Sequence, residues 1–321
     1  MSKPSLTTFG EAMIRFSPPM GERTSRTDSF NVSIGGAELN VAISAKAMGI
    51  DSTWISSLPD DEHGARILRH CREFEVKPSI IPSRARVGLY FAELGPAPRG
   101  STVHYDRAGS AFAELSKTEV NFSHHVGSPA ALFSSGISMA VGKDSPELVE
   151  DFLDSSPGAL RCFEVNYRSK LWDRESAAAA IKRVLGKVDV LFASPQDLTD
   201  LLHLGKSVHE ATQHLMDELG VKLISVPSRT GNIGQVGTNS AITYSSGSKC
   251  ESSADGFVLD PIGAGDAGTG AFLGEYLVTG DVALATEASV HASAFKQTHY
   301  GDAAQFSRHE LSEAGIYRVK R

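Results

Sequence analysis

Short apolar runs alternate with segments of helical periodicity over much of this 321-residue chain, most regularly between residues 130 and 226. Apolar runs predict strands at 132–135, 160–165, 188–193 and 222–226. Periodic segments predict helices at 145–153, 175–184 and 208–219. Such alternation is typical of a parallel sheet with helices on both faces. We therefore predict an α/β fold with a mainly parallel sheet, in which ligands bind at the carboxyl ends of the strands.

The first 110 residues follow a different pattern. Residues 6–17 predict one strand interrupted at Gly10, and residues 87–94 and 102–105 predict a hairpin. A hairpin without a covering helix leaves exposed edges unless it is a lid or an oligomer contact. We predict a single domain over 1–321, with lid strands from about 11–34 and 86–108. Further elements are predicted as a helix at 41–48, a strand at 53–58 and a helix at 61–74 with Asp60 as N-cap.

Charge and composition narrow the function classes. The formal net charge is -7 and basic residues are dispersed, which argues against a nucleic-acid surface. No apolar stretch approaches membrane-spanning length and no signal sequence is evident, so we predict no membrane partner and a cytoplasmic protein. Three cysteines, at 71, 162 and 250, lack the spacing of a zinc site or a disulfide framework.

A glycine-rich turn at residues 260–268 opens into a helix predicted at 269–278. Free N–H groups of Ala264, Gly265 and Asp266 at such a helix start would form an anion site. Asp266 also puts a carboxylate at its rim, where it would repel a phosphate unless it accepts a proton from an attacking hydroxyl. Phosphoryl transfer to an alcohol needs this combination of donors and base.

The glycine-rich segments allow other interpretations. Gly263, Gly265 and Gly268 spell a dinucleotide fingerprint, but that motif should follow the first strand of a βαβ unit rather than lie in the last fifth of the chain. A purely structural turn, in which Asp266 only favours the helix dipole, remains open. Gly205-Lys206-Ser207 resembles the end of a P-loop, but no predicted strand precedes it.

Other polar positions are candidates for a ligand site. Gly35-Gly36 before a helix, with Asn40 one turn inside, permits close approach of a ligand. The predicted hairpin would bring Tyr90, Tyr105 and Arg107 over this point. Arg168 follows the strand at 160–165 and points to the expected crevice, with an exposed salt bridge as its alternative role.

Two of these motifs resemble the signatures of the PfkB, or ribokinase-like, carbohydrate kinases. They are Gly35-Gly36-x-x-x-Asn40 and Asp260-x-x-Gly263-Ala264-Gly265-Asp266, separated by over 220 residues of α/β pattern. Finer strings resemble the 2-keto-3-deoxygluconate kinase branch. They are Gly10-Glu11 with Arg15-Phe16-Ser17-Pro18-Pro19, Tyr105-x-Arg107-x-x-Ser110-Ala111, Asn166-Tyr167-Arg168-x-Lys170-Leu171-Trp172 and Lys296-x-Thr298-x-x-Gly301-Asp302.

The resemblance implies a Rossmann-type three-layer core with a small β lid, ATP as phosphoryl donor, and Mg²⁺ held largely by the nucleotide. It implies Asp266 as catalytic base beside an anion hole at Gly263, Ala264 and Gly265. The sugar-facing residues implied are Gly35, Gly36, Asn40, Tyr90, Tyr105, Arg107 and Arg168. The nucleotide-facing residues implied are Ser194, Ser228, Gly231, Gly263 and Gly265, with Asp197 indirectly near the metal. Lid strands of this kind favour a homo-oligomer.

The two arginines discriminate between substrate classes. A 2-keto-3-deoxy sugar acid carries a carboxylate, which guanidinium groups recognise by paired N–H bonds. The resemblance therefore implies phosphorylation of 2-keto-3-deoxygluconate to its 6-phosphate, with a kinase of a neutral sugar such as fructose or ribose as the alternative. Gluconate-derived and galactonate-derived substrates are not separated.

The chain departs from the family pattern around the nucleotide. Glu164-Val165 replaces the usual Asp-Pro, and Ser194-x-x-Asp197 replaces Asn-x-x-Glu. The nucleotide loop reads Pro227-Ser228-Arg229-Thr230-Gly231 where two glycines are usual, and Gly268 replaces a bulky aromatic residue. These departures keep open a sugar-acid binding protein with weakened catalysis.

Overall fold

The computed structural model describes residues 3–313. The strands are β1 Ser5–Phe9, β2 Met13–Ser17, β3 Asn31–Gly35, β4 Asp51–Pro59, β5 Lys77–Ser83, β6 Gly88–Glu93, β7 Thr102–Asp106, β8 Ala131–Ser135, β9 Leu160–Glu164, β10 Val190–Phe192, β11 Leu223–Arg229, β12 Val236–Ser245 and β13 Ser248–Phe257. The α-helices are α1 Ala37–Ala47, α2 Glu62–Glu73, α3 Gly136–Met139, α4 Ser145–Asp154, α5 Arg174–Leu185, α6 Val208–Asp217, α7 Ala264–Thr279, α8 Val282–Lys296 and α9 Arg308–Ser312. Short 3₁₀ turns at Lys117–Glu119 and Phe122–His124 and a π-helical turn at Asp197–Leu201 complete the elements.

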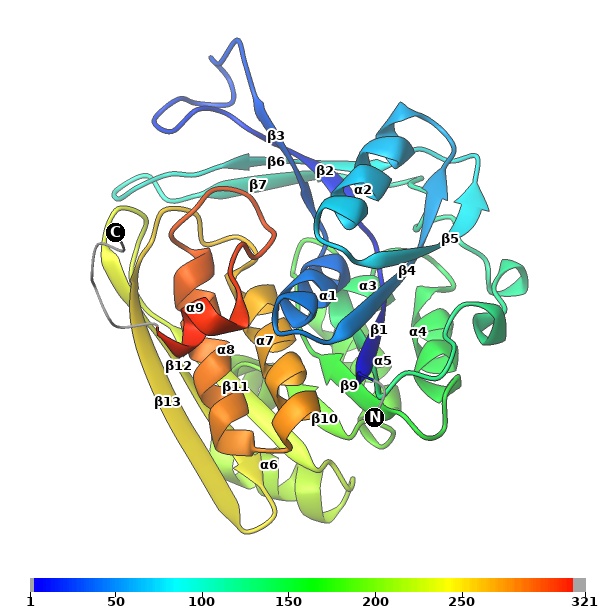
Figure 1. Cartoon of the computed structure of the whole chain (residues 1–321), viewed down its shortest axis with the longest axis vertical. Coiled ribbons are helices and arrows are strands. Elements are labelled where there is room, and N and C mark those ends of the chain that lie inside the picture. Colours follow the sequence, from blue (N-terminus) through cyan, green and yellow to red (C-terminus); the bar gives the residue numbers. More distant parts are fainter. Residues whose placement is uncertain (1–2, 314–321) are drawn as a thin grey trace.

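The core has three layers, because alternate residues of the central strands point to opposite faces. Leu132, Phe163 and Ile224 pack with buried side chains of α4, α5 and α6 on one face. Phe133 and Phe192 pack with α1, α7 and α8 on the other. Strands that are buried on both faces have continuous apolar sequences, which explains why these strands could be predicted from apolar runs. Figure 1 shows the two helical layers with the sheet between them.

Within residues 3–313 the large sheet has the strand order β13-β12-β11-β10-β9-β8-β1-β4-β5. Every pairing from β5 to β11 is parallel, and only β12 and β13 pair antiparallel at one edge. The predicted mainly parallel α/β fold is therefore confirmed. The strands β12 and β13 and the helix α8 were not predicted.

A second, four-stranded sheet with the order β3-β2-β6-β7 projects over the carboxyl ends of the core strands (Figure 1). The prediction of one strand over 6–17 was wrong, because β1 belongs to the large sheet and β2 to the small one. The chain crosses between them at Gly10, where an added Cβ would lie 2.1 Å from Glu38 Oε2. The small sheet lies within the lid ranges expected from the sequence, apart from Gly35 at the end of β3.

Side chains cap the N-termini of helices α2 and α6, and the predicted cap of α2 was wrong by one residue. The N-cap of α2 is Asp61 rather than Asp60, and its carboxylate accepts from the N–H groups of His63 and Gly64. At α6, Ser207 accepts from the Glu210 N–H as a capping serine should. The Glu210 carboxylate accepts from the N–H of Lys206, one residue before the cap, so Ser207 and Glu210 do not form a reciprocal capping box.

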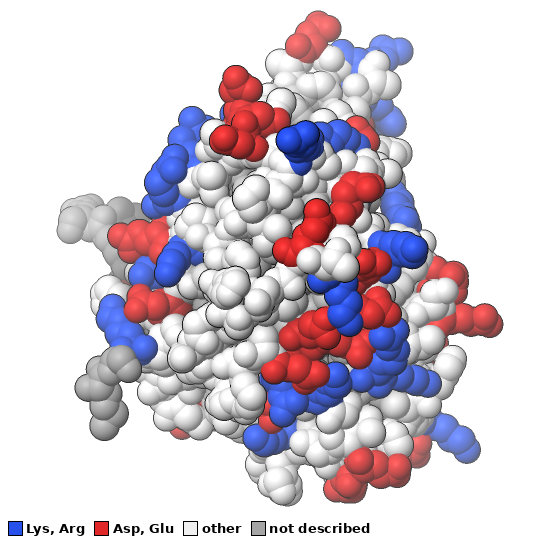
Figure 2. Space-filling view, turned by 90° about the vertical axis from the view of Figure 1, so that its right-hand side faces the viewer, with Lys and Arg blue, Asp and Glu red and all other residues white. Residues whose placement is uncertain are grey.

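Charged side chains of both signs are intermingled on the face shown in Figure 2, consistent with the dispersed basic residues of the sequence. Among residues 3–313, no helix has both the length and the apolar character that crossing a membrane requires. Cys71 and Cys162 are buried and Cys250 is partly buried, all as free thiols.

Candidate active site

A cavity of about 500 Å³ lies between the small sheet and the carboxyl ends of the core strands. This volume is in the range of small-molecule sites. Its walls come from the small sheet, the start of α1, the ends of β9 and β11, and the start of α7. Sequence-predicted residues lining it are Gly35, Gly36, Asn40, Tyr90, Tyr105, Arg107, Arg168, Ser228, Gly263, Ala264, Gly265 and Asp266.

The start of α7 forms the floor of this cavity. Gly263, the N-cap, has φ 83°, and a Cβ added there would lie 2.1 Å from the carbonyl oxygen of Asp302. The Ala267 N–H bonds to the Gly263 carbonyl at 2.9 Å, whereas the N–H groups of Gly265 and Asp266 have no backbone acceptor within the described chain. Of the three N–H groups expected to be free, that of Ala264 bonds to the Pro261 carbonyl at 3.4 Å. The remaining two donors lie at the positive end of a 16-residue helix beside the cavity, and anion binding there stays a prediction.

Asp266 lies in the first turn of α7 and is partly buried. Its Oδ2 accepts a 2.7 Å hydrogen bond from Asn40 Nδ2, which joins the two signature motifs across 226 residues of sequence. Burial raises the pKa of Asp266, against the opposing effects of Asn40 and Arg168. A carboxylate with a raised pKa and one oriented oxygen is a better proton acceptor than an exposed aspartate.

Two further glutamates surround Asp266. Glu164 lines the cavity and accepts a hydrogen bond from Thr269 Oγ1 at 3.3 Å. Burial, and then the charge of Asp266, raise the pKa of Glu164. Glu38 is buried in α1 and accepts from Ser135 Oγ at 2.6 Å and Ser138 Oγ at 2.8 Å. Burial raises the pKa of Glu38 to about 7. Neither glutamate was assigned to the site from the sequence.

The small sheet brings its predicted residues together. The rings of Tyr90 and Tyr105 stack at 5.8 Å, and the Arg107 guanidinium lies 5.6 Å from the Tyr105 ring centre. Arg107 Nε donates to Glu11 Oε2 at 2.8 Å and Nη2 contacts the same oxygen, in a buried ion pair. Arg107 therefore already has a carboxylate partner within the protein.

Two arginines at the ends of core strands line the cavity without a carboxylate partner. Asn166, with φ 42°, turns the chain after β9 and carries Arg168 to the cavity. Arg168 is exposed, and its guanidinium makes no hydrogen bond or ion pair with any residue in the described part of the chain, although its backbone carbonyl accepts from the Leu171 N–H at 2.9 Å. Arg229, at the end of β11, donates from Nη1 to the Pro261 carbonyl at 3.2 Å. Two arginine side chains without a carboxylate partner therefore face a cavity that acidic side chains also line.

Ser194, Asp197 and Gly231 do not line this cavity, as far as residues 3–313 define it. Asp197 Oδ2 accepts from the Ser194 N–H at 2.9 Å and from Ser194 Oγ at 2.7 Å, so these two residues bind each other. Gly231 lines a second cavity of about 310 Å³ beneath the β6–β7 loop. Their nucleotide and metal roles stay predictions.

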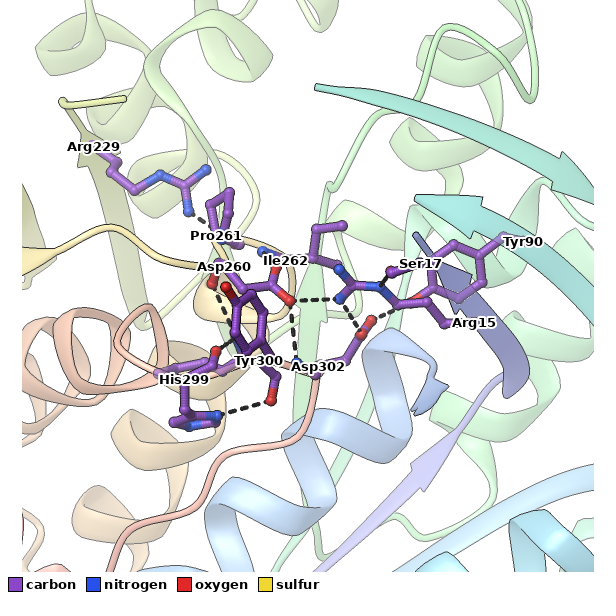
Figure 3. Close-up of polar contacts among 12 residues, drawn as sticks. Arg15, Ser17, Tyr90, Arg229, Asp260, Pro261, Ile262, His299, Tyr300 and Asp302 are labelled. Carbon is purple, nitrogen blue, oxygen red and sulfur yellow. Dashed lines mark hydrogen bonds and ion pairs between the residues drawn. The ribbon is translucent and has the colours of Figure 1, made fainter. Parts of the chain in front are cut away.

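A buried polar cluster beside the cavity was not assigned from the sequence (Figure 3). Arg15 Nη1 contacts Asp302 Oδ1 at 2.8 Å and Asp260 Oδ2 at 2.9 Å. The Tyr90 hydroxyl donates to Asp302 Oδ2. Burial and then the Asp302 carboxylate raise the pKa of Tyr90, so its hydroxyl keeps the proton. The only sequence signal was that Arg15 and Asp302 fall in two of the branch-like strings.

No group of three or more His, Cys, Asp or Glu side chains able to hold a metal ion occurs in residues 3–313. Asp266 and Glu164 nevertheless present carboxylates to the cavity, and oxygen ligands of this kind suit Mg²⁺. Mg²⁺ usually keeps several waters and binds through one or two carboxylates together with substrate phosphates. The donor set therefore fits a metal ion that arrives with a nucleotide.

Comparisons with known proteins show what this chain is similar to. The model of the pfkB family carbohydrate kinases matches residues 3–308. A 2-dehydro-3-deoxygalactonokinase of Haloferax volcanii is 33% identical over 98% of this chain and 99% of its own. A 2-dehydro-3-deoxygluconokinase of Thermoproteus tenax is 30% identical over 93% and 90%. The crystal structure of a 2-dehydro-3-deoxygluconokinase of Thermotoga maritima superposes with a TM-score of 0.92 at 30% identity, covering 97% of this chain and 98% of that one.

Proposed function

Because the chain belongs to the pfkB family of carbohydrate kinases, we propose that it transfers the terminal phosphoryl group of ATP to a hydroxyl of a 2-keto-3-deoxy sugar acid, giving the 6-phosphate. One observation carries the proposal. A carboxylate, Asp266, and the free N–H groups of Gly265 and Asp266 face the same cavity at the start of α7. A base beside an oriented set of N–H donors is what phosphoryl transfer to an alcohol requires.

Each residue in this arrangement has a distinct task. Asp266 accepts the proton of the attacking hydroxyl, while Asn40 holds its Oδ2 and so fixes which way the carboxylate faces. The N–H groups at the start of α7 bind the negative charge of the transferred group. Mg²⁺ bound with the nucleotide would neutralise phosphate charge, with Glu164 or Asp266 as nearby protein oxygens.

The acid-sugar assignment rests mainly on Arg168. Its guanidinium lines the cavity and has no carboxylate partner among residues 3–313, so it is free to bind one on a ligand. Arg107 is paired with Glu11, so its guanidinium is not free to bind a second carboxylate. It supports the cavity wall and the Tyr105 ring instead. The names of the relatives, a 2-dehydro-3-deoxygalactonokinase and a 2-dehydro-3-deoxygluconokinase, support the same substrate class.

A kinase of a neutral sugar is the second candidate function. The Arg107–Glu11 pair favours it, because one of the two arginines expected to bind a carboxylate is already engaged. Under either candidate, we further propose cytoplasmic residence and assembly through the lid strands.

A phosphorylation screen tests the proposal. Purified protein with ATP and Mg²⁺ is offered 2-keto-3-deoxygluconate, its galacto epimer, fructose and ribose, and sugar phosphate is measured directly. We expect turnover with one or both sugar acids. Turnover with a neutral sugar alone would establish the second candidate, and acid-sugar binding without ADP release would identify a binding protein instead.

Arg168→Ala tests the carboxylate contact. We expect the affinity for the acid sugar to fall by about 2 kcal/mol, roughly 30-fold, as when one member of a buried charge pair is removed. Arg86→Ala, which removes an exposed arginine paired with Asp106 on the lid, is the matched control and should leave affinity unchanged. Equal affinities for the parent and Arg168→Ala would remove the main support for an acid substrate.

A further inference from the structure

A buried ion cluster joins segments that are far apart in the sequence. Arg15 comes from β2 of the small sheet, Asp260 from the turn before α7, and Asp302 from the segment after α8. The Arg15 and Asp260 side chains are 2% and 0% exposed, and Arg15 Nε also donates to Ser17 Oγ at 2.8 Å. Figure 3 shows the guanidinium between the two carboxylates. None of these groups has a role in the chemistry proposed above.

The cluster is also balanced in charge. Lys296 is fully buried at the end of α8, and its Nζ donates to the carbonyls of Asp260 at 3.0 Å and His299 at 3.4 Å. The Asp260 carboxylate further accepts from the N–H groups of Ile262 and Gly301, both at 3.1 Å. Two buried cations therefore lie with two buried carboxylates. Buried ion pairs often add no stability over apolar residues of the same volume, so a geometric role is a better explanation than stability.

Asp302 lies between the two signature motifs. A Cβ on Gly35 would lie 2.3 Å from Asp302 Oδ2 and 2.3 Å from the Tyr90 hydroxyl. A Cβ on Gly263 would lie 2.1 Å from the Asp302 carbonyl oxygen. The side chain of Asp302 thus touches the sugar-facing wall and its backbone touches the N-cap of α7. The position of Asp302 therefore fixes the separation between these two parts of the cavity.

We propose that Arg15 is a positioning residue, whose contacts with Asp302 and Asp260 hold the lid wall at a fixed separation from the start of α7. The inference rests on the proposed kinase function, because it assigns that separation to the alignment of the attacking hydroxyl with the transferred phosphoryl group. Arg15 does not itself line the cavity, so it acts through Tyr90, Asp302 and the turn at Asp260.

Loss of the Arg15 contacts should affect turnover more than substrate binding. A misplacement of about 1 Å can cost roughly 100-fold in rate while the same contacts still bind the substrate. A lid held less firmly also admits water to the phosphoryl group, so ADP forms without sugar phosphate. Loss of Arg15 should therefore lower kcat more than it raises KM, and should raise the ratio of ADP released to sugar phosphate formed.

Arg15→Lys and Arg15→Met test this in the full-length protein. Lysine keeps the positive charge but lacks the planar guanidinium whose N–H groups reach both Asp260 and Asp302. Methionine removes the charge while keeping most of the side-chain volume. We expect kcat to fall by about 10- to 100-fold in both, KM to change less than about threefold, and the ADP to sugar-phosphate ratio to rise above that of the parent.

Arg308→Met is the matched control. It removes an ion pair of Arg308 with Glu275, with distances of 2.8 and 2.7 Å, that joins α9 to α7 away from the cavity. It should lower thermal stability without changing the product ratio, which does not depend on the amount of folded enzyme. If the Arg15 variants resemble Arg308→Met, with an unchanged ratio and an unchanged kcat per folded molecule, Arg15 is only a structural residue.

Amide hydrogen exchange separates this inference from the proposed function. Exchange should increase together at residues 88–106 and at the hydrogen-bonded amides of α7 from Ala267 onward in Arg15→Met, and not in Arg308→Met. A parent protein that phosphorylates no sugar would defeat the proposed function, yet the exchange result would still decide whether Arg15 joins the two walls. Unchanged exchange in those segments would refute the joining role.

Discussion

Single side chains in this protein are placed by contacts between residues distant in the sequence. Asp266 is oriented by Asn40, which lies 226 positions earlier, and Glu38 by two serines about 100 positions later. Burial raises the pKa of both carboxyl groups, so each costs free energy when ionised in the folded protein. Such a cost persists in a fold only where other contacts or a function compensate, and the proposed catalytic role of Asp266 would account for its cost.

Asp266→Asn should lower kcat by roughly 100-fold or more and leave sugar binding nearly unchanged, since general-base contributions are of that size. The asparagine keeps an oxygen that can accept from Asn40 Nδ2, so the local hydrogen bond can survive. Steady-state kinetics and calorimetric titration with the sugar acid are the measurements. Near-normal turnover in a correctly folded variant would remove Asp266 from the mechanism.

Because the pKa of Glu38 is raised in the folded protein, we expect the free energy of unfolding to depend on pH. Its pKa is raised by burial from 4.5 to about 7, so between these values the folded state binds more protons than the unfolded state. The contribution of Glu38 to the free energy of unfolding is therefore greatest below pH 4.5 and falls as the pH rises through 7, by up to about 3 kcal/mol.

Glu38→Gln keeps an oxygen for Ser135 and Ser138 and removes this titration. Denaturant unfolding from pH 4 to pH 8 should show a flatter stability profile in this variant than in the parent. Glu62→Gln, the same change at an exposed first-turn position of α2, is the control and should leave the profile as it is. Parallel profiles for parent and Glu38→Gln would contradict the assignment.

At the scale of elements, most of the core was predictable and the reason is burial. Strands such as β8, β9 and β10 are covered on both faces, so their apolar runs are visible in the sequence. Six of the ten residues of strand β13 are exposed and three are serine, so no apolar run marks it. The helix α8 is rich in alanine and small side chains, which blurs its periodicity.

The site residues that lie in the signature motifs or just after a strand could be predicted from the sequence. Those that depend on contacts between residues far apart in the sequence could not. Asn40, Arg168 and Asp266 were identified from local strings, and they line one cavity. No local pattern indicates that Arg107 pairs with Glu11 or that Arg15 pairs with Asp302, because these contacts span 96 and 287 residues. The pattern over 6–17 shows an interruption at Gly10, but it does not indicate that β1 and β2 on either side of it join different sheets.

The N-cap of α7 gives a prediction at this scale. Gly263→Ala should destabilise the fold by more than about 1 kcal/mol and abolish turnover, because it combines an unfavourable positive φ with a collision against the Asp302 backbone. Gly280→Ala at the other end of the same helix is the control: its φ is 69°, and no atom lies within 4 Å of an added Cβ. It should cost about 1 kcal/mol and leave kcat unchanged. Thermal unfolding and kinetics measure both effects, and equal losses in the two variants would contradict the role of the Asp302 contact.

At the scale of the whole molecule, the small sheet is the part least covered by the rest of the fold (Figure 1). Its edge strands are β3 and β7, and four of the five residues of β7 are exposed. An uncovered edge of this kind is a site for pairing with another chain. The proposed assembly through the lid follows from this edge.

Val32→Lys should shift the protein toward a smaller species in sedimentation equilibrium, because a charge on the edge strand β3 opposes pairing between subunits. Val32 is 38% exposed. Val278→Lys, at a 44% exposed valine near the end of α7, is the matched control and should leave the mass unchanged. A parent protein that is entirely monomeric at micromolar concentration would rule out the assembly.

The ion pair between the second strand and the segment after the last long helix also bears on biosynthesis. Translation delivers Arg15 early and Asp302 only after 287 further residues. Until the segment with Asp302 leaves the ribosome, the Arg15 guanidinium lacks one of the carboxylates that offset the cost of burying its charge. The small sheet therefore cannot pack against the core. A nascent chain therefore holds an unfinished pocket through nearly the whole of its synthesis, and phosphoryl transfer begins only when the far end of the polypeptide has closed it.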